Sequence, residues 1–143
     1  MYTSERDKLR QHYADVWHKA RSNQPLDALE QQIAQVIAQH PEYHKMLENR
    51  QHIQNEYLPE MGETNPFLHM GMHLGIREQV ATDRPAGIAQ VHRVLTLKYG
   101  DVLQAEHDMM NCLAEALWNS QKYQQAPDEV AYLQCLQQLI KEK

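Results

Sequence analysis

Apolar residues recur every three or four positions along nearly the whole chain, a period that is typical of amphipathic α-helices. No segment alternates apolar and polar residues over the length that a half-buried strand needs. The pattern therefore predicts an all-α protein. We expect residues 1–143 to form a single α-helical domain, a bundle of about six to seven helices.

Prolines, glycines and capping residues mark the expected ends of these helices. In the first part of the chain, the predicted helices run from about Ser4 to Ser22, from Pro25 to His40, and from Pro41 to about Asn49. The break before Pro41 is expected because the residue that precedes a proline disfavours helical geometry. Residues 50–64 lack a clear period and are predicted to form an irregular connection.

The second part of the chain carries sharper boundary signals. Asn65 followed by Pro66 is a typical helix start, and this helix is expected to reach about Ala81. The remaining predicted helices are opened by Pro85 and ended by Gly100, capped by Asp101 and extended to about Lys122, and started by Pro127. The apolar stripes of the predicted helices include Leu9, Leu29, Leu117, Trp118 and Val130.

Charge and composition narrow the classes of partner and the location. With 14 basic and 19 acidic residues the net charge is −5, and the basic residues are scattered, which argues against nucleic acid and against an anionic membrane surface. No apolar run approaches the length of a membrane span, and the first ten residues do not resemble a signal peptide, so we expect a cytoplasmic protein. Cys112 and Cys135 stand 23 residues apart in no metal or redox spacing and are interpreted as reduced thiols.

Nine histidines are the unusual feature of the composition. His69 and His73 lie four residues apart on one predicted helix, so their rings share a face and could bind one metal ion. His40 and His44 have the same spacing, but Pro41 interrupts the helix that would align them. Two such pairs are present, against roughly 0.55 expected by chance, although a plain polar stripe would also give this spacing.

Further ligands are available on other predicted helices. His107 falls within an apolar face, where an imidazole needs a partner to offset its desolvation, and we expect it to be the third ligand. Its neighbour Glu106 lies on the same face, and a buried carboxylate there would need a metal, a cation or a histidine N–H. His44 and Glu48, four residues apart, could complete the shell or simply be surface polar residues.

The other histidines and two glycines receive structural interpretations. His12 is expected to be a satisfied core residue, and we interpret three histidines as facing solvent, namely His18, His52 and His92. Gly71 and Gly75 form a G-x-x-x-G pattern inside a helix, where each glycine costs about 1 kcal/mol of helix propensity relative to alanine. We expect a tight helix crossing there, with the close approach of a ligand as the functional alternative.

Several segments together resemble a bacterial family of unknown function. These are HPEYH, GETNPFLHMGMHLGIREQ, DRPAGI, AEHDMMNCLAEALWNSQ and PDEVAYLQCL. Over nearly its whole length the chain resembles the domain of unknown function 1841 (DUF1841), a resemblance that implies no established activity and no catalytic residues.

A looser resemblance is to helical metal bundles of the hemerythrin and DinB kinds. His44 with Glu48, and His69 with His73, are similar to the first two elements of the hemerythrin pattern. The third element departs from it, because Cys112 stands where an aspartate would follow His107, which counts against a di-iron site. In the DinB pattern, His44 would be the isolated histidine that precedes a spaced pair.

The sequence therefore predicts one divalent transition metal, zinc or iron, held by His69, His73 and His107, with His44 or Glu48 assisting. If the protein is an enzyme, Glu106 or Glu63 would serve as the general base on an unidentified small-molecule substrate. The alternative is a metal-free protein interaction module, such as a homodimer that uses Trp17, Tyr57 or Tyr123.

Overall fold

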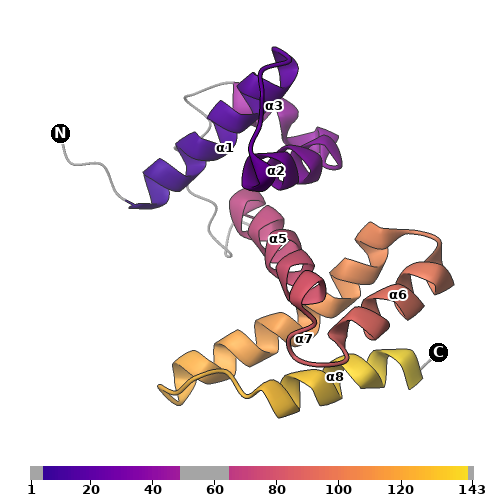
Figure 1. The fold of residues 1–143 in the computed structure, drawn as a ribbon. Coiled ribbons are helices and arrows are strands. Elements are labelled where there is room, and N and C mark those ends of the chain that lie inside the picture. Colours follow the sequence, from indigo (N-terminus) through magenta and orange to yellow (C-terminus); the bar gives the residue numbers. More distant parts are fainter. Residues whose placement is uncertain (1–4, 49–64, 142–143) are drawn as a thin grey trace. The chain divides into compact units, whose positions relative to one another are not determined.

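The computed structural model describes residues 5–48 and 65–141, which are almost entirely helical (Figure 1). Within these ranges there is no strand, so the prediction of an all-α protein is confirmed. The helices are α1 (Glu5–Arg21), α2 (Ala28–Ala38), the 3-10 helix η1 (Pro41–Tyr43), α3 (His44–Glu48), α5 (Pro66–Thr82), α6 (Ile88–Tyr99), α7 (Val102–Lys122) and α8 (Glu129–Lys141).

The chain divides into two compact units, residues 1–74 and residues 75–143. The division falls inside α5, between Leu74 and Gly75. The prediction of one domain over the whole chain stays a prediction. Among the described residues, no helix combines the length and the apolar character that a membrane span requires.

In the first unit, α1, α2, α3 and the first half of α5 bury apolar residues in a common core. α1 contributes Tyr13 and Val16, spaced as neighbours on one helical face, and α2 contributes Val36 and Ile37. The other buried members are Ala14, Ile33, Met46, Leu47, Phe67 and Met70. Leu9 and Leu29, which were predicted to lie in core stripes, are instead exposed.

The start of α2 corrects the predicted boundary at Pro25. Asp27 is the N-cap: its Oδ1 accepts a hydrogen bond from Glu30 N at 2.8 Å, and Glu30 Oε1 accepts one from Asp27 N at 3.0 Å. This capping box satisfies backbone donors that Pro25 could not satisfy two residues earlier. Lys19 Nζ of α1 also donates to Glu30 Oε2 at 2.9 Å, and this hydrogen bond lowers the pKa of Glu30.

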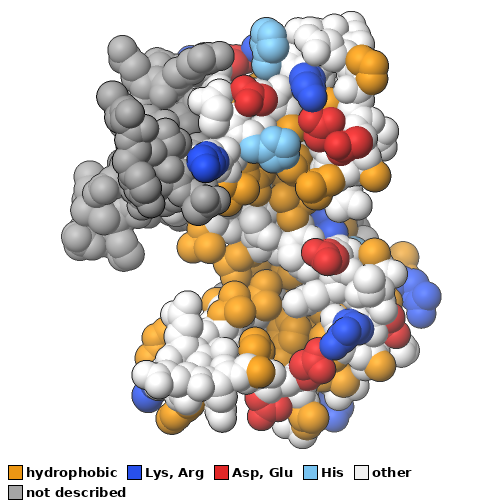
Figure 2. All heavy atoms as spheres, turned by 60° about the vertical axis from the view of Figure 1, so that its left-hand side comes forward, with side chains coloured by type: hydrophobic (Ala, Val, Ile, Leu, Met, Phe, Trp, Pro, Cys, Tyr) orange, Lys and Arg blue, Asp and Glu red, His pale blue; other side chains and the backbone are white. Residues whose placement is uncertain are grey.

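The second unit packs α6, α7 and α8 around its own core. α6 buries Ile88, Val91 and Leu95, and α8 buries Tyr132 and Leu136. The buried residues of α7 are Ala105, Glu106, Met109, Met110, Cys112 and Leu113. The predicted stripe of α7 extended to Leu117 and Trp118, which are 44% and 58% exposed, and Val130 of α8 is exposed as well. Figure 2 shows hydrophobic side chains, coloured orange, exposed on the surface of the molecule.

Several boundary predictions are confirmed in the second half of the chain. Asn65 Oδ1 accepts hydrogen bonds from Phe67 N and Leu68 N, so it caps α5. Asp101 caps α7, and Gly100 ends α6 in the left-handed region, with φ of 64°. α6 begins at Ile88 rather than at Pro85, because the Asp83 carboxylate accepts hydrogen bonds from the backbone N–H groups of Gly87 and Ala89.

Gly71 and Gly75 do not mark the tight helix crossing that was predicted. A Cβ atom at Gly71 would lie 4.0 Å from the Tyr13 hydroxyl, which is an ordinary contact distance. At Gly75 a Cβ atom would have no neighbour within 4 Å among the described residues. No described helix therefore crosses closely at Gly75, and the alternative of a ligand approaching this helix face remains.

A buried carboxylate organises the interior of the second unit. Glu106 is 0% exposed, and its oxygens accept hydrogen bonds from Arg77 Nε at 3.1 and 3.2 Å and from His92 Nε2 at 2.8 Å. Arg77 Nη2 lies 3.0 Å from Glu106 Oε1 and completes a two-pronged ion pair. His92 was predicted to face solvent. That prediction is wrong, because the ring is half-buried against Glu106.

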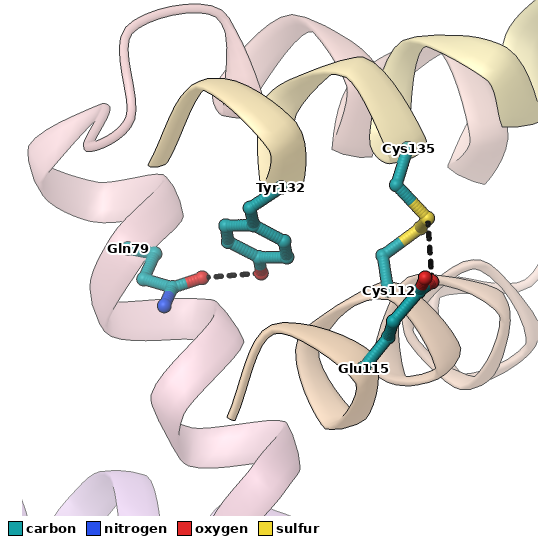
Figure 3. The surroundings of a disulfide bond; sticks show 5 residues. All are labelled: Gln79, Cys112, Glu115, Tyr132 and Cys135. Carbon is teal, nitrogen blue, oxygen red and sulfur yellow. Dashed lines mark hydrogen bonds between the residues drawn. A yellow bond between two sulfur atoms is a disulfide. The ribbon is translucent and has the colours of Figure 1, made fainter. Parts of the chain in front are cut away.

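The two cysteines form a disulfide, which corrects the interpretation that they are reduced thiols. Cys112 of α7 and Cys135 of α8 are bonded, with their Cα atoms 5.7 Å apart (Figure 3). The spacing along the chain could not reveal this pair, because the two helices are brought together by tertiary packing. Disulfides are typical of oxidising compartments, so this bond does not support the predicted cytoplasmic location, which stays a prediction from the sequence alone.

Replacing both cysteines by serine should destabilise the second unit. A cross-link that spans 23 residues restricts the unfolded chain, and its removal is expected to cost about 3 kcal/mol of unfolding free energy. Urea unfolding of the wild type and of the Cys112→Ser/Cys135→Ser variant, each with and without reductant, measures the difference. Reductant should destabilise only the wild type. Two reactive thiols in denatured, non-reduced wild-type protein would contradict the cross-link.

Arg77→Met should be strongly destabilising, because it leaves the Glu106 carboxylate buried without its arginine. Breaking a buried ion pair from one side typically costs about 3–5 kcal/mol. The double variant Arg77→Met/Glu106→Gln removes the buried charge and should recover a large part of that loss in urea unfolding. If the double variant is as unstable as Arg77→Met alone, or less stable, the ion pair does not carry the effect.

Candidate metal centre

The candidate site begins with two histidines on α5. The Asn65 cap and Pro66 fix the start of this helix, so His69 and His73 follow one turn apart on one face. Their ring centroids are 4.8 Å apart, and the rings meet edge to face at 84°. His73 is 0% exposed, whereas His69 is partly exposed. The structure thus brings together the pair that the spacing predicted.

His40 joins this pair from the end of α2. Its backbone has left helical geometry, with φ of −126° and ψ of 69°, as expected of a residue that precedes a proline. Its ring centroid lies 5.1 Å from that of His69 and 4.9 Å from that of His73. Sequence analysis identified the spaced pair His40 and His44 but predicted His44 as the ligand. His40 is the site residue that sequence reasoning missed.

A backbone carbonyl fixes the tautomer of His40. The last carbonyls of a helix lack intrahelical donors, and side chains often supply them. His40 Nδ1 lies 2.7 Å from the Val36 carbonyl oxygen, so Nδ1 carries the hydrogen and donates it. The lone pair is therefore on Nε2, which is buried and has no hydrogen-bond partner among the described residues. Because His40 is only 3% exposed, water does not readily satisfy this nitrogen.

The three imidazoles come close enough for one ion to bridge them. Ligand nitrogens of His40, His69 and His73 lie within 4.8 Å of one another. Three nitrogens on a tetrahedral zinc ion, each at about 2.05 Å, would be about 3.3 Å apart. Small rotations of the side chains would cover this difference. The donor set therefore fits a single transition-metal ion, and a carbonyl that orients a histidine ligand is a common feature of such sites.

The surroundings of the three rings are aromatic and apolar. The Tyr43 ring stacks parallel to His40, with centroids 5.5 Å apart and an interplanar angle of 3°, and meets His69 edge-on at 6.4 Å. Met70, which lies between His69 and His73 in the sequence, is fully buried in the core of the first unit. In such low-dielectric surroundings, interactions between an ion and its ligands are stronger than in water.

The structure does not bring the predicted assisting ligands to this cluster. His44 Nε2 lies 2.7 Å from the Ile37 carbonyl oxygen and donates to it, and its ring packs on Trp17 with centroids 4.4 Å apart. Glu48 forms an ion pair with Arg21 at the surface. Both side chains are therefore used in local contacts. His44 thus provides a hydrogen-bond donor to the Ile37 carbonyl at the end of α2, just as His40 provides one to the Val36 carbonyl.

The other predicted site residues belong to the second unit or fall outside the described residues. His107 lies on α7 in the second unit and is half-buried, and its role as a ligand stays a prediction from the sequence. Glu106, a predicted general base, is held by Arg77 and His92. Glu63, the other predicted base, and Tyr57 are outside the described residues.

Comparison with known proteins identifies the family but no activity. No curated protein and no solved structure matches the chain. The family model described as domain of unknown function (DUF1841) matches residues 5–138, which include α1 and α2, the three clustered histidines and the disulfide. The match spans nearly the whole chain, so the protein belongs to the DUF1841 family.

Proposed function

We propose that this protein binds one divalent transition-metal ion through His40, His69 and His73. The observation that carries the proposal is the state of His40: its Nδ1 is committed to the Val36 carbonyl, and its buried Nε2 has no partner among the described residues. A neutral imidazole in this tautomer is a metal ligand ready to bind. The neighbouring rings of His69 and His73 supply further nitrogens within 4.8 Å.

The chemistry of these donors favours zinc over iron. Imidazole suits zinc, copper, nickel and iron, but mononuclear iron sites of the open type usually combine two histidines with a carboxylate. In the described part of the chain, the carboxylates predicted as site residues are engaged in ion pairs, Glu48 with Arg21 and Glu106 with Arg77. Three histidines and an open fourth position are a known arrangement of catalytic zinc.

The charge of the ligand set indicates what else such an ion would attract. Neutral imidazole ligands would leave both positive charges of the ion uncompensated in a largely buried setting, so an anionic ligand is favoured at any coordination position that stays open. When bound in such a site, zinc lowers the pKa of a water ligand to about 7. We therefore expect any reaction to be a hydrolysis or hydration of a small electrophilic substrate. The reaction would not require Glu106, which is neutralised by Arg77.

Removing any of the three histidines should abolish stoichiometric zinc binding. Untagged wild-type protein is expected to bind about one equivalent by elemental analysis and calorimetry. His40→Ala, His69→Ala and His73→Ala should each weaken binding by at least about 100-fold, beyond the 10- to 100-fold typical of outer-shell residues. His44→Ala and the exposed His18→Ala are the controls and should retain the ion.

Two outcomes would overturn this proposal. One is wild-type protein that takes up no zinc, copper, nickel or iron. The other is a His40→Ala variant that binds zinc as tightly as His18→Ala does. His107→Ala belongs in the same series, because it tests the sequence-based prediction of a further ligand independently of the three clustered residues.

Zinc should also stabilise the fold, because a bridging ion ties the end of α2 to α5. At a free zinc concentration one hundred times its dissociation constant, the unfolding free energy should rise by about 2.7 kcal/mol. Thermal melting with zinc or with a chelator measures this for the wild type and for His73→Ala, and the variant should show no response. A large loss of structure in chelator would instead assign the ion a purely structural role.

The alternative of a metal-free interaction module has less support from the described residues. Trp17 is partly buried against His44, so it offers little surface to a partner. Tyr123 is exposed, with Lys122 Nζ 5.4 Å from its ring centroid. A homodimer, a protein partner and a cytoplasmic location stay predictions from the sequence.

A further inference from the structure

The second unit contains a cleft that the proposed metal site does not use. Its volume is about 750 Å³, within the range of small-molecule sites in proteins. The walls come from the second half of α5, the turn that follows it, α7 and the start of α8. The apolar walls include Pro85, Leu113, Leu117 and Pro127, and the lining residues all belong to residues 75–143.

The floor of the cleft is open because one lining residue on α5 is Gly75. Glycine within a helix costs about 1 kcal/mol relative to alanine, so its presence needs a physical reason. Close packing of another helix does not supply that reason, since a Cβ atom at Gly75 would meet nothing within 4 Å among the described residues. The missing side chain instead leaves the helix backbone accessible from the cleft.

A fixed polar pair lies at one wall of the cleft. The Tyr132 hydroxyl donates a hydrogen bond to Gln79 Oε1 at 2.7 Å, and Figure 3 shows the tyrosine ring of α8 pointing toward α5. Burial raises the pKa of Tyr132 to about 12, so this hydroxyl remains a neutral donor at physiological pH. The bond holds the Gln79 carboxamide in one orientation at this wall.

The rim of the cleft is acidic overall. It carries two carboxylates, Glu78 and Glu129, against the single cation Arg84. Arg84 Nη2 lies 4.0 Å from Glu129 Oε1, so that pair neutralises itself and the Glu78 carboxylate remains as the excess charge. An acidic rim above an apolar interior complements a cation that carries an apolar body.

From these observations we infer that the cleft binds a small amphipathic organic cation, with its apolar part over Gly75 between α5, α7 and α8 and its ammonium group at the rim. The largely apolar walls select a ligand with a hydrocarbon body. The charge at the rim selects against a carboxylate of the same size. This site is independent of the proposed zinc ion, because the cleft is lined only by residues of the second unit.

Three probes of equal chain length test the inference: octylammonium, octanol and octanoate, titrated into the full-length protein by calorimetry and NMR. Octylammonium should bind saturably and about 2- to 5-fold more tightly than octanoate, as expected for one net charge at an exposed rim. Octanol should lie between them. Glu78→Gln should remove most of the preference for the amine while leaving the affinity for octanol unchanged.

Gly75→Leu supplies the decisive variant, because the leucine side chain would occupy the floor of the cleft where the apolar part of the ligand is expected to lie. It should weaken octylammonium binding at least about tenfold without lowering the melting temperature, since leucine has a higher helix propensity than glycine. Gly71→Ala, a glycine substitution on the same helix but outside the cleft lining, is the control and should bind as the wild type does.

The inference fails on any of three results. These are the absence of saturable binding for all three probes, a Gly75→Leu variant that binds octylammonium like the wild type, and tighter binding of octanoate than of octylammonium. Should Gly75→Leu melt at a lower temperature, the smaller Gly75→Ala decides the matter, because it should still bind more weakly than Gly71→Ala.

Discussion

The candidate metal centre depends on how one helix ends. Pro41 forces the chain out of α2, and His40 N donates to the Ile37 carbonyl rather than to Val36. The Val36 carbonyl is thereby left for the His40 side chain, whose Nδ1 lies 2.7 Å away. A local rule of helix termination thus selects the tautomer of a buried histidine and leaves its other nitrogen next to His69 and His73. The His44 side chain donates to the next carbonyl, that of Ile37, so its Nε2 is not available as a metal ligand.

Local sequence signals predicted the helices well where a single side chain decides the boundary. Asn65, Gly100 and Asp101 act where the sequence placed them, because capping involves neighbours within three or four residues. Helix α2 begins later than Pro25 predicts, because the capping box of Asp27 and Glu30 sets its start. The signal for the correct start was present in the spacing of those two residues.

The histidine site was predictable only in part for a related reason. His69 and His73 share a continuous helix, so their spacing determines their geometry. His40 follows the end of α2 and comes close to His69 and His73 only through tertiary packing. The helical periodicity of the sequence does not predict contacts between separate helices. The same limit applies to the disulfide and to His92, since α7 brings Cys112 to Cys135 and Glu106 to His92 through tertiary packing alone. Sequence reasoning did foresee that a buried carboxylate would need a cation or a histidine N–H, and Glu106 has both.

The two units differ in how buried charge is compensated. In the second unit, the buried Glu106 carboxylate is neutralised by the Arg77 guanidinium. Because Glu106 is held in this ion pair, it is not free to act as a general base. In the first unit the clustered histidines are neutral ligands, which would not cancel the charge of an ion. Any reactivity at that centre would therefore come from the ion itself and from the substrate or anion that it attracts, with the protein supplying orientation through the Val36 carbonyl and the Tyr43 ring.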